Sequence, residues 1–137
     1  NATGTFSGCA DSRGGLQVTL GEIIGAVKAD AVVTMVDPSV HVPGCFAADL
    51  MSDVLAFARP GSLLVTGLTT DQAVRTAAIK HLVAVLVIEG KQVGVEMTES
   101  ARDEGVSIYR TPLSKYEVCG LLMQAGLRPY RKAVDEG

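Results

Sequence analysis

The residues best suited to ligand chemistry gather in one short stretch, Thr66–Asp71, which reads Thr-Gly-Leu-Thr-Thr-Asp. It lies between an apolar run and a stretch of helical composition. Amide groups in the first turn of a helix lack intrahelical partners and lie at the positive end of the helix dipole, so such a loop can bind an anion. Ordinary turn formation and helix capping, with Asp71 as the N-cap, explain the same sequence. The candidate ligand-binding residues of this loop are Thr66, Gly67, Thr69, Thr70 and Asp71.

Two later stretches can complete the same anion site. Gly90 follows a second apolar run, and Thr111, Ser114 and Lys115 follow a third. A glycine allows the backbone to approach a ligand closely, and hydroxyl and ammonium groups donate hydrogen bonds to an anion. Plain capping of the next helix is the alternative explanation for Thr111, Ser114 and Lys115. We therefore add Gly90, Thr111 and Ser114 to the candidate ligand-binding residues.

Two carboxylates lie one helical turn apart at Asp49 and Asp53, a spacing at which they can share a metal ion. N-capping by Asp49 and a favourable position for Asp53 near the helix N-terminus explain the pair without a metal. His41 and His81 are isolated in the sequence and lack the spacing of zinc ligands, so we expect them at the surface. The sequence predicts neither a metal site nor a cofactor.

The three cysteines, Cys9, Cys45 and Cys119, are widely spaced and odd in number, which favours reduced thiols over a disulfide framework. Cys45 follows Gly44 and precedes a predicted helix, and a helix N-terminus lowers the pKa of a thiol. This position makes Cys45 a candidate nucleophile. A packed thiol is the interpretation that we favour, because only His41 and His81 are available as imidazole partners.

Apolar, β-branched runs alternate with helix-like stretches, and this rhythm predicts the elements that position the loops. The predicted strands are Ala31–Val36, Leu63–Thr66, Val83–Ile88 and Val106–Tyr109. Val40–Ala47 is a further short strand, with an irregularity at Pro43-Gly44. Alternation of this kind requires crossover connections, hence a mainly parallel sheet with helices packed against it. Right-handed crossovers place the loops after Thr66, Ile88 and Tyr109 at the carboxyl edge of one sheet, where ligands bind in such folds.

The predicted helices have recognisable start and stop signals. A Thr19–Glu22 capping box opens a helix that runs to Val27, and Gly105 and Gly126 stand where left-handed residues follow helices. The remaining predicted helices are Leu50–Ala58, capped by Asp49, then Gln72–Lys80, Thr98–Glu104 and Lys115–Gln124.

Length and composition limit the class of protein. The chain has 137 residues, the size of one domain, and 47% of them are hydrophobic. Its formal charge of −3 gives no reason to expect nucleic acid or an anionic membrane as a partner. The longest apolar stretch, Leu82–Ile88, has seven residues, far fewer than the about 20 that span a bilayer, and no secretory signal is visible. We therefore expect a cytoplasmic protein.

We divide the chain into three parts by composition. Residues 1–15 are small and polar and are expected to form a flexible leader or an extension foreign to the domain, residues 16–127 form one α/β domain, and residues 128–137 form a solvated tail. The apolar surplus of this small domain predicts a homodimer, formed through the edge Val40–Ala47 or the helix Leu50–Ala58.

The block Gly44–Ala58 resembles the signature Gly-Cys-Tyr-Ala-Ser-Asp-Leu-Leu-Ser-Asp-Val-Met-Ala of small stand-alone DRTGG-domain proteins. The likeness extends from about Leu16 to Leu127, and Thr111–Glu117 is similar to the last loop of that family. It implies a three-layer α/β/α domain similar to the N-terminal domains of HPr kinase/phosphorylase and of Mur ligases. The residues of this signature block that match the family are Gly44, Cys45, Asp49, Ser52 and Asp53.

The resemblance implies a regulatory role. Related domains lie beside phosphate acetyltransferase modules and between the CBS domains of regulated pyrophosphatases, and stand-alone copies are often encoded near hydrogenase or electron-transfer subunits. The prediction is a non-catalytic regulatory or ligand-sensing domain that binds a nucleotide-like or phosphorylated small molecule, or docks onto a redox or metabolic enzyme complex. A small enzyme that acts on a phosphorylated metabolite is the alternative.

The sequence departs from this family and from its kinase relatives. A kinase of the HPr type needs the P-loop Gly-x-x-x-x-Gly-Lys-Ser/Thr to hold phosphates, and the chain has no such string. Where the family has Gly-Asp-Arg, this chain has Gly67-Leu68-Thr69, and where it has Thr-Gly-Gly, this chain has Ile88-Glu89-Gly90. The charged pair that gives the family its name is therefore absent, although both loop glycines are kept.

Overall fold

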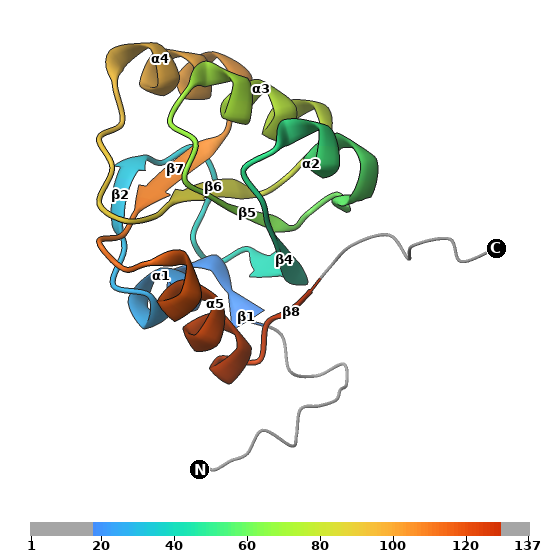
Figure 1. The fold of residues 1–137 in the computed structure, drawn as a ribbon, viewed down its shortest axis with the longest axis vertical. Helices are drawn as coiled ribbons and strands as arrows, with labels where there is room; N and C mark the ends of the chain where they lie inside the picture. Colours follow the sequence, from blue (N-terminus) through green and yellow to red (C-terminus); the bar gives the residue numbers. More distant parts are fainter. Residues whose placement is uncertain (1–17, 130–137) are drawn as a thin grey trace, which may run out of the picture.

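The computed structural model describes residues 18–129 and arranges six of their strands in one sheet, in the order β2-β7-β6-β5-β4-β8 (Figure 1). All neighbouring pairs are parallel except β2 and β7, which run antiparallel. The predicted α/β fold with a mainly parallel sheet is confirmed. The strands of this sheet are β2 (Asp30–Val33), β4 (Gly44–Ala47), β5 (Leu63–Thr66), β6 (Ala84–Val87), β7 (Ser107–Arg110) and β8 (Arg128–Pro129).

Helices cover both faces of the sheet, which gives three layers (Figure 1). One face carries α2 (Met51–Phe57), α3 (Asp71–Ile79) and α4 (Val95–Glu104), and the other carries α1 (Leu20–Ala26) and α5 (Lys115–Gln124). Every residue of β5 and of β6 is buried, as expected for parallel strands covered on both sides.

Side chains alternate between two separate cores. Leu64 belongs to the core under α2, α3 and α4, and its neighbours Leu63 and Val65 belong to the core under α1 and α5. Residues paired across the parallel ladder share a face, as Phe46 and Leu64 do. The sheet therefore separates two apolar layers.

The irregularity predicted at Pro43-Gly44 is a complete break, so Val40–Ala47 is not one strand but two, in different sheets. Residues before the proline form β3 (His41–Val42), which pairs antiparallel with β1 (Val18–Thr19) in a separate small sheet. Residues after it form β4 in the main sheet. Proline has no amide hydrogen to give to a ladder, so a strand is interrupted there.

The predicted start of α1 and α5 and the predicted end signals of α4 and α5 are confirmed. Thr19 and Glu22 form the predicted box of α1, and Ser114 and Glu117 form a box that opens α5 at the predicted Lys115. Gly105 and Gly126 adopt the predicted left-handed conformation, with φ of 75° and 97°.

Three helix starts differ from the prediction. Helix α4 begins at Val95 rather than Thr98, since Gly94 serves as its N-cap. The N-cap of α3 is Thr70, so Asp71 is the first helical residue and not the cap. The N-cap of α2 is Leu50, whose side chain makes no capping bond, and Asp49 does not cap that helix.

The C-terminal boundary of the α/β domain differs from the prediction. Arg128 and Pro129, which we assigned to a solvated tail, pair with Gly44 and Cys45 as strand β8, although both remain exposed. The predicted leader, Cys9 and residues 130–137 lie outside the described residues. Within residues 18–129, no helix is long and apolar enough to cross a membrane.

Candidate functional site

The carboxyl edge of the sheet is organised around the carboxylate of Asp49, which lies just after β4. It accepts hydrogen bonds from the backbone N–H of Gly67 at 2.8 Å, from the Thr66 hydroxyl at 3.1 Å and from the Lys115 ammonium at 2.9 Å. These donors follow β5 and open α5, so three separate segments meet at one carboxylate. This explains why Asp49 does not cap α2: its oxygens are used across the sheet edge instead.

The same contacts control the charge of Asp49. The hydrogen bond from the Gly67 N–H, followed by that from Lys115, lowers the pKa of Asp49 to about 2. Partial burial acts in the opposite direction but is outweighed. Asp49 therefore carries a full negative charge near neutral pH. It already accepts hydrogen bonds from the donors that could bind an external anion, which are the Gly67 N–H, the Thr66 hydroxyl and the Lys115 ammonium.

Two further cations hold the neighbouring loops, and one of them contacts Gly67. The Lys91 ammonium donates to the Gly67 carbonyl at 3.2 Å and lies 3.9 Å from a carboxylate oxygen of Glu89. Arg110, the last residue of β7, donates from Nε to the Lys91 carbonyl at 2.8 Å and from Nη2 to the Gly90 carbonyl at 3.1 Å. The ends of β4, β5, β6 and β7 thus meet in one network of three cations and two carboxylates.

Gly67 lies close to side chains from two other loops. A Cβ atom on this residue would lie 3.0 Å from Lys91 Nζ and 3.7 Å from Asp49 Oδ1. The closest of these atoms is the end of a flexible side chain, which can move away. A side chain at position 67 would therefore displace the cation rather than break the backbone.

The predicted residues of the β7–α5 loop are occupied by the fold. Thr111 is fully buried, and its hydroxyl donates to the Val27 carbonyl at 2.7 Å and accepts from the Leu113 N–H at 3.2 Å. The Ser114 hydroxyl accepts from the Glu117 N–H as a helix cap. Capping of the next helix, the alternative that the sequence offered, describes Ser114. Thr111 instead holds the Val27 carbonyl, 84 residues away, a tertiary contact that capping does not include.

The predicted residues after β5 divide into two groups. Thr66 and Gly67 belong to the Asp49 network, and the Thr66 hydroxyl also accepts from the Leu68 N–H at 3.1 Å. Asp71 instead forms an ion pair of 2.9 Å with Arg75, one turn along the same helix. Thr70 is exposed at the N-cap of α3, without a capping bond from its side chain, and Thr69 is half-buried.

The other candidate residues lie away from this network. Cys45 lies within β4, and burial raises its pKa to about 11, so it is a protonated, half-buried thiol and not an activated nucleophile. Ser52 and Asp53 are exposed on α2, and His41 and His81 are exposed as predicted. Over residues 18–129, no group of three or more His, Cys, Asp or Glu side chains is arranged to hold a metal ion.

Sequence reasoning missed Lys91 and Arg110. Lys91 follows the Glu89-Gly90 turn after β6, and Arg110 directly precedes Thr111. The available signal was a basic residue at the end of a predicted parallel strand, where all such ends meet at one edge. The sequence prediction rested on hydroxyl groups and glycines instead, because these are the residue types of a phosphate-binding loop.

The fold has a known counterpart. A crystal structure of the CBS and DRTGG domains of the regulatory region of Clostridium perfringens pyrophosphatase, in complex with its activator diadenosine tetraphosphate, matches with a TM-score of 0.66. The match covers 78% of this chain at 17% sequence identity, which shows a shared fold. This chain spans 46% of that structure, so it corresponds to a part of the regulatory region. No family model and no curated protein matches the sequence.

Proposed function

We propose that this chain is a DRTGG-type regulatory domain that binds a phosphorylated or nucleotide-like anion at the carboxyl edge of its sheet. The observation that carries the proposal is that three cations hold the loops at this edge: Lys91 donates to the Gly67 carbonyl and Lys115 to the Asp49 carboxylate, while Arg110 donates to the carbonyls of Gly90 and Lys91. Three cations face two carboxylates, Asp49 and Glu89, so the edge has a net positive charge while the whole chain is acidic. A cationic edge in an acidic protein favours a small anion over a nucleic acid.

The cations retain donors for a ligand. An ammonium group has three donor hydrogens, and the contacts described above use one of them in a hydrogen bond at each lysine. The side chains of Lys91 and Lys115 are 48% and 40% exposed, so their remaining donors can reach a bound phosphate. Arg110 adds a planar guanidinium, whose geometry suits phosphate oxygens.

An anion that binds at this edge must compete with the Asp49 carboxylate or avoid it. It already holds the Gly67 N–H, the Thr66 hydroxyl and Lys115, so a phosphate either replaces it or binds on the solvent side of the lysines. A phosphate group carries more negative charge than a carboxylate and competes well for the same donors. A phosphate that replaces the carboxylate breaks the link between Asp49 after β4 and Lys115 at the start of α5, which is a means to change the shape of a regulatory domain.

The structural counterpart supports a regulatory role. Its nucleotide activator belongs to the pyrophosphatase region that contains both CBS and DRTGG domains, and this chain shares the fold of part of that region. The Gly44–Ala58 block, which resembles the DRTGG signature, contains Asp49, the central carboxylate of the network. Fold and signature thus favour the same family, and we extend the regulatory role to this chain as a proposal.

Thermal unfolding with a ligand panel tests the proposal. The panel contains adenine and uridine nucleotides, diadenosine polyphosphates, sugar phosphates and NAD(H). A ligand at about 100 times its dissociation constant stabilises the fold by about 2.7 kcal/mol, which raises the melting temperature measurably. Lys91→Met should reduce the shift, and the matched control Lys80→Met should keep it, since Lys80 follows the end of α3 at the opposite edge of the sheet. Gly67→Val should also reduce the shift, because its side chain displaces the Lys91 ammonium.

The outcomes separate the competing functions. No shift with any compound in the panel would contradict the small-ligand proposal and leave docking onto an enzyme complex. A shift accompanied by chemical conversion of the ligand would favour the enzymatic alternative. The homodimer stays a prediction. Two exposed leucines supply an apolar surface for it: Leu50, the N-cap of α2, is 62% exposed, and Leu55 on α2 is 43% exposed. The mass of the particle in solution tests this prediction.

A further inference from the structure

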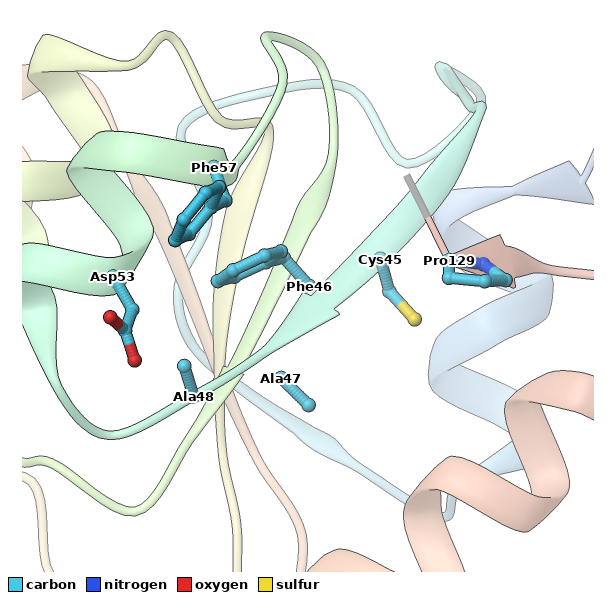
Figure 2. Close-up of a pocket in the computed structure, with 7 residues that line it drawn as sticks. All are labelled: Cys45, Phe46, Ala47, Ala48, Asp53, Phe57 and Pro129. Carbon is cyan, nitrogen blue, oxygen red and sulfur yellow. The ribbon is translucent and has the colours of Figure 1, made fainter. Parts of the chain in front are cut away.

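A pocket of about 340 Å³ lies at the outer edge of β4 (Figure 2). β4 pairs with β5 from Cys45 to Ala47, but on its other side β8 reaches only as far as Cys45. In the part of the chain that the structure describes, no strand pairs with the outer side of Ala47. The volume is typical of pockets that hold a small ligand. The lining residues are Cys45, Phe46, Ala47, Ala48, Asp53, Phe57 and Pro129.

The backbone of Ala47 offers this pocket one donor and one acceptor. The Ala48 N–H donates to the Val65 carbonyl of β5 at 3.0 Å. The carbonyl of the same trans peptide belongs to Ala47, and it points the opposite way, to the outer edge. The N–H and C=O of one strand residue point to the same side, so the Ala47 N–H faces the outer edge too. A planar ring that has a donor next to an acceptor, such as adenine, can bind both groups.

Side chains from both faces of the sheet border this edge. Figure 2 shows the rings of Phe46 and Phe57 next to each other on the α2 side of the strand, while the Cys45 sulfur points to the other side, beside Pro129. Both phenylalanines are half-buried, so part of each ring is accessible. A flat ring that continues the plane of the sheet beyond Ala47 therefore has aromatic rings on one side and the Cys45 and Pro129 side chains on the other.

A carboxylate stands at the end of the pocket nearest the cation network. Ala48 lines the pocket and directly precedes Asp49, which accepts a hydrogen bond from Lys115. Asp53 is exposed, and Figure 2 shows its carboxylate beyond the phenylalanine rings, at the end of the pocket where Ala48 lies. An ionised carboxylate only accepts hydrogen bonds, and the hydroxyl groups of a ribose donate them. Along β4, the chain thus presents groups suited to a base at Ala47, a ribose near Asp53 and a phosphate near Lys115.

We propose that this pocket binds the purine nucleoside part of the ligand, with the base hydrogen-bonded to the Ala47 backbone and the ribose hydroxyls to Asp53. The inference rests on the proposed function, because the phosphate of the same molecule binds the cations at the carboxyl edge. A purine has two fused rings and covers more of Phe46 and Phe57 than a pyrimidine does. The substrate class of the site is therefore a purine nucleotide and not a sugar phosphate.

Calorimetric titration of the full chain with AMP, adenosine and ribose 5-phosphate tests the proposal. AMP should bind about 10-fold more tightly than ribose 5-phosphate, or tighter still, and adenosine should bind although it has no phosphate. Equal affinities of AMP and ribose 5-phosphate would overturn the pocket and leave the anion site intact. Equal affinities of AMP and adenosine would support the pocket and contradict the anion site. An adenosine that does not bind would overturn the pocket, and equal affinities of AMP and UMP would overturn the purine preference.

The Ala47 amide reports the hydrogen bond to the base. Saturation with AMP should slow its hydrogen exchange about 10-fold or more. The Phe46 amide faces β5 and serves as a reference in the same strand, so its exchange should be unchanged. Binding of AMP without slower exchange at Ala47 would overturn this placement of the base.

Substitution of Ala47 separates the backbone donor from the side chain. Ala47→Pro removes the outward N–H, which an edge strand tolerates because no described strand pairs with it, whereas Ala47→Ser keeps the donor. The affinity for AMP should fall about 10-fold in the proline variant and stay unchanged in the serine variant. Equal affinities of the two variants would contradict the backbone hydrogen bond.

Removal of the Asp53 carboxylate tests the ribose contact on the exposed surface of α2. Asp53→Ala should weaken AMP about 10-fold and leave the affinity for 2′,3′-dideoxy-AMP unchanged, since that nucleotide lacks both hydroxyl groups. The matched control Asp103→Ala, at an exposed position on α4, should change neither affinity. An equal loss for both nucleotides would show that Asp53 does not bind the ribose.

Discussion

Thr66, the last residue of β5, and Thr111, the first residue after β7, are both fully buried at the carboxyl edge of the sheet, and the loop that follows each leads into a helix. Their hydroxyl groups are used differently. Thr111 donates to the backbone carbonyl of Val27, an atom fixed by the fold. Thr66 donates to the side-chain carboxylate of Asp49, which is 54% exposed and is held in place by hydrogen bonds.

This difference separates a structural loop from one that can respond to a ligand. A backbone carbonyl cannot leave its position without unfolding the segment that contains it. A carboxylate on a partly exposed side chain can rotate away and be replaced by another anion at the same donors. We therefore expect substitutions in the β7 loop to change the stability of the fold and substitutions around Asp49 to change ligand binding as well.

The largest loss of stability is expected for Thr111→Val. Valine has a similar shape but leaves the buried Val27 carbonyl and the Leu113 N–H without their hydroxyl partner. We expect a loss of about 2–3 kcal/mol in the free energy of unfolding, measured by denaturant titration. The stabilisation by an identified ligand should be unchanged. If that stabilisation disappears in a folded variant, Thr111 takes part in binding and the two loops are not distinct.

A smaller loss is expected for Thr66→Val. It removes one of three donors to Asp49 and the acceptor of the Leu68 N–H, which together should cost about 1–2 kcal/mol in the same titration. Unlike Thr111→Val, it should also weaken ligand stabilisation, because the hydroxyl is one of the donors shared by Asp49 and an incoming phosphate. Unchanged binding would show that the ligand does not use the donors that contact Asp49.

The smallest effect on stability is expected for Asp49→Asn, and it depends on pH. The pKa of Asp49 is about 2 in the folded chain, below the about 3.9 of an unperturbed aspartate. The stabilising contribution is therefore fully present above about pH 4 and is lost as the pH falls towards 2. We expect about 1 kcal/mol, since solvent screens a group that is more than half exposed.

Denaturant titrations between pH 2 and pH 7 check this dependence. Asp49→Asn should remove part of the slope below pH 4, and the control Asp103→Asn, at an exposed position on α4, should keep it. The same variant should bind a phosphorylated ligand more tightly than the parent chain, because the competing anion is gone. Weaker binding would show that the carboxylate assists the ligand and does not compete with it.

Most of the fold follows from local patterns. The apolar runs of β5, β6 and β7 and the capping boxes at Thr19 and Ser114 lie where the sequence places them. The antiparallel position of β2 and the separation of β3 from β4 were not predicted. Both depend on which distant strand lies alongside, and no local pattern specifies that.

The position of the loops at the carboxyl edge follows from the sequence, whereas ligand binding by their residues stays a prediction. Crossover handedness correctly placed the loop glycines and threonines at the carboxyl edge. The role of Asp49 was missed because its sequence position, just before a helix, favours an N-cap. Lys91 and Arg110 were missed because a charged side chain in a loop carries no local sign of the partner it will meet.

The sequence by itself determined the periods of the strands and helices, since these depend on side chains within a few residues of one another. Tertiary structure alone decided that the Asp49 carboxylate binds the Gly67 N–H, 18 residues away, and the Lys115 ammonium, 66 residues away. A carboxylate pairs with whichever donors the assembled sheet brings within hydrogen-bond distance. The identity of those donors is a property of the packed strand ends and not of the sequence around Asp49.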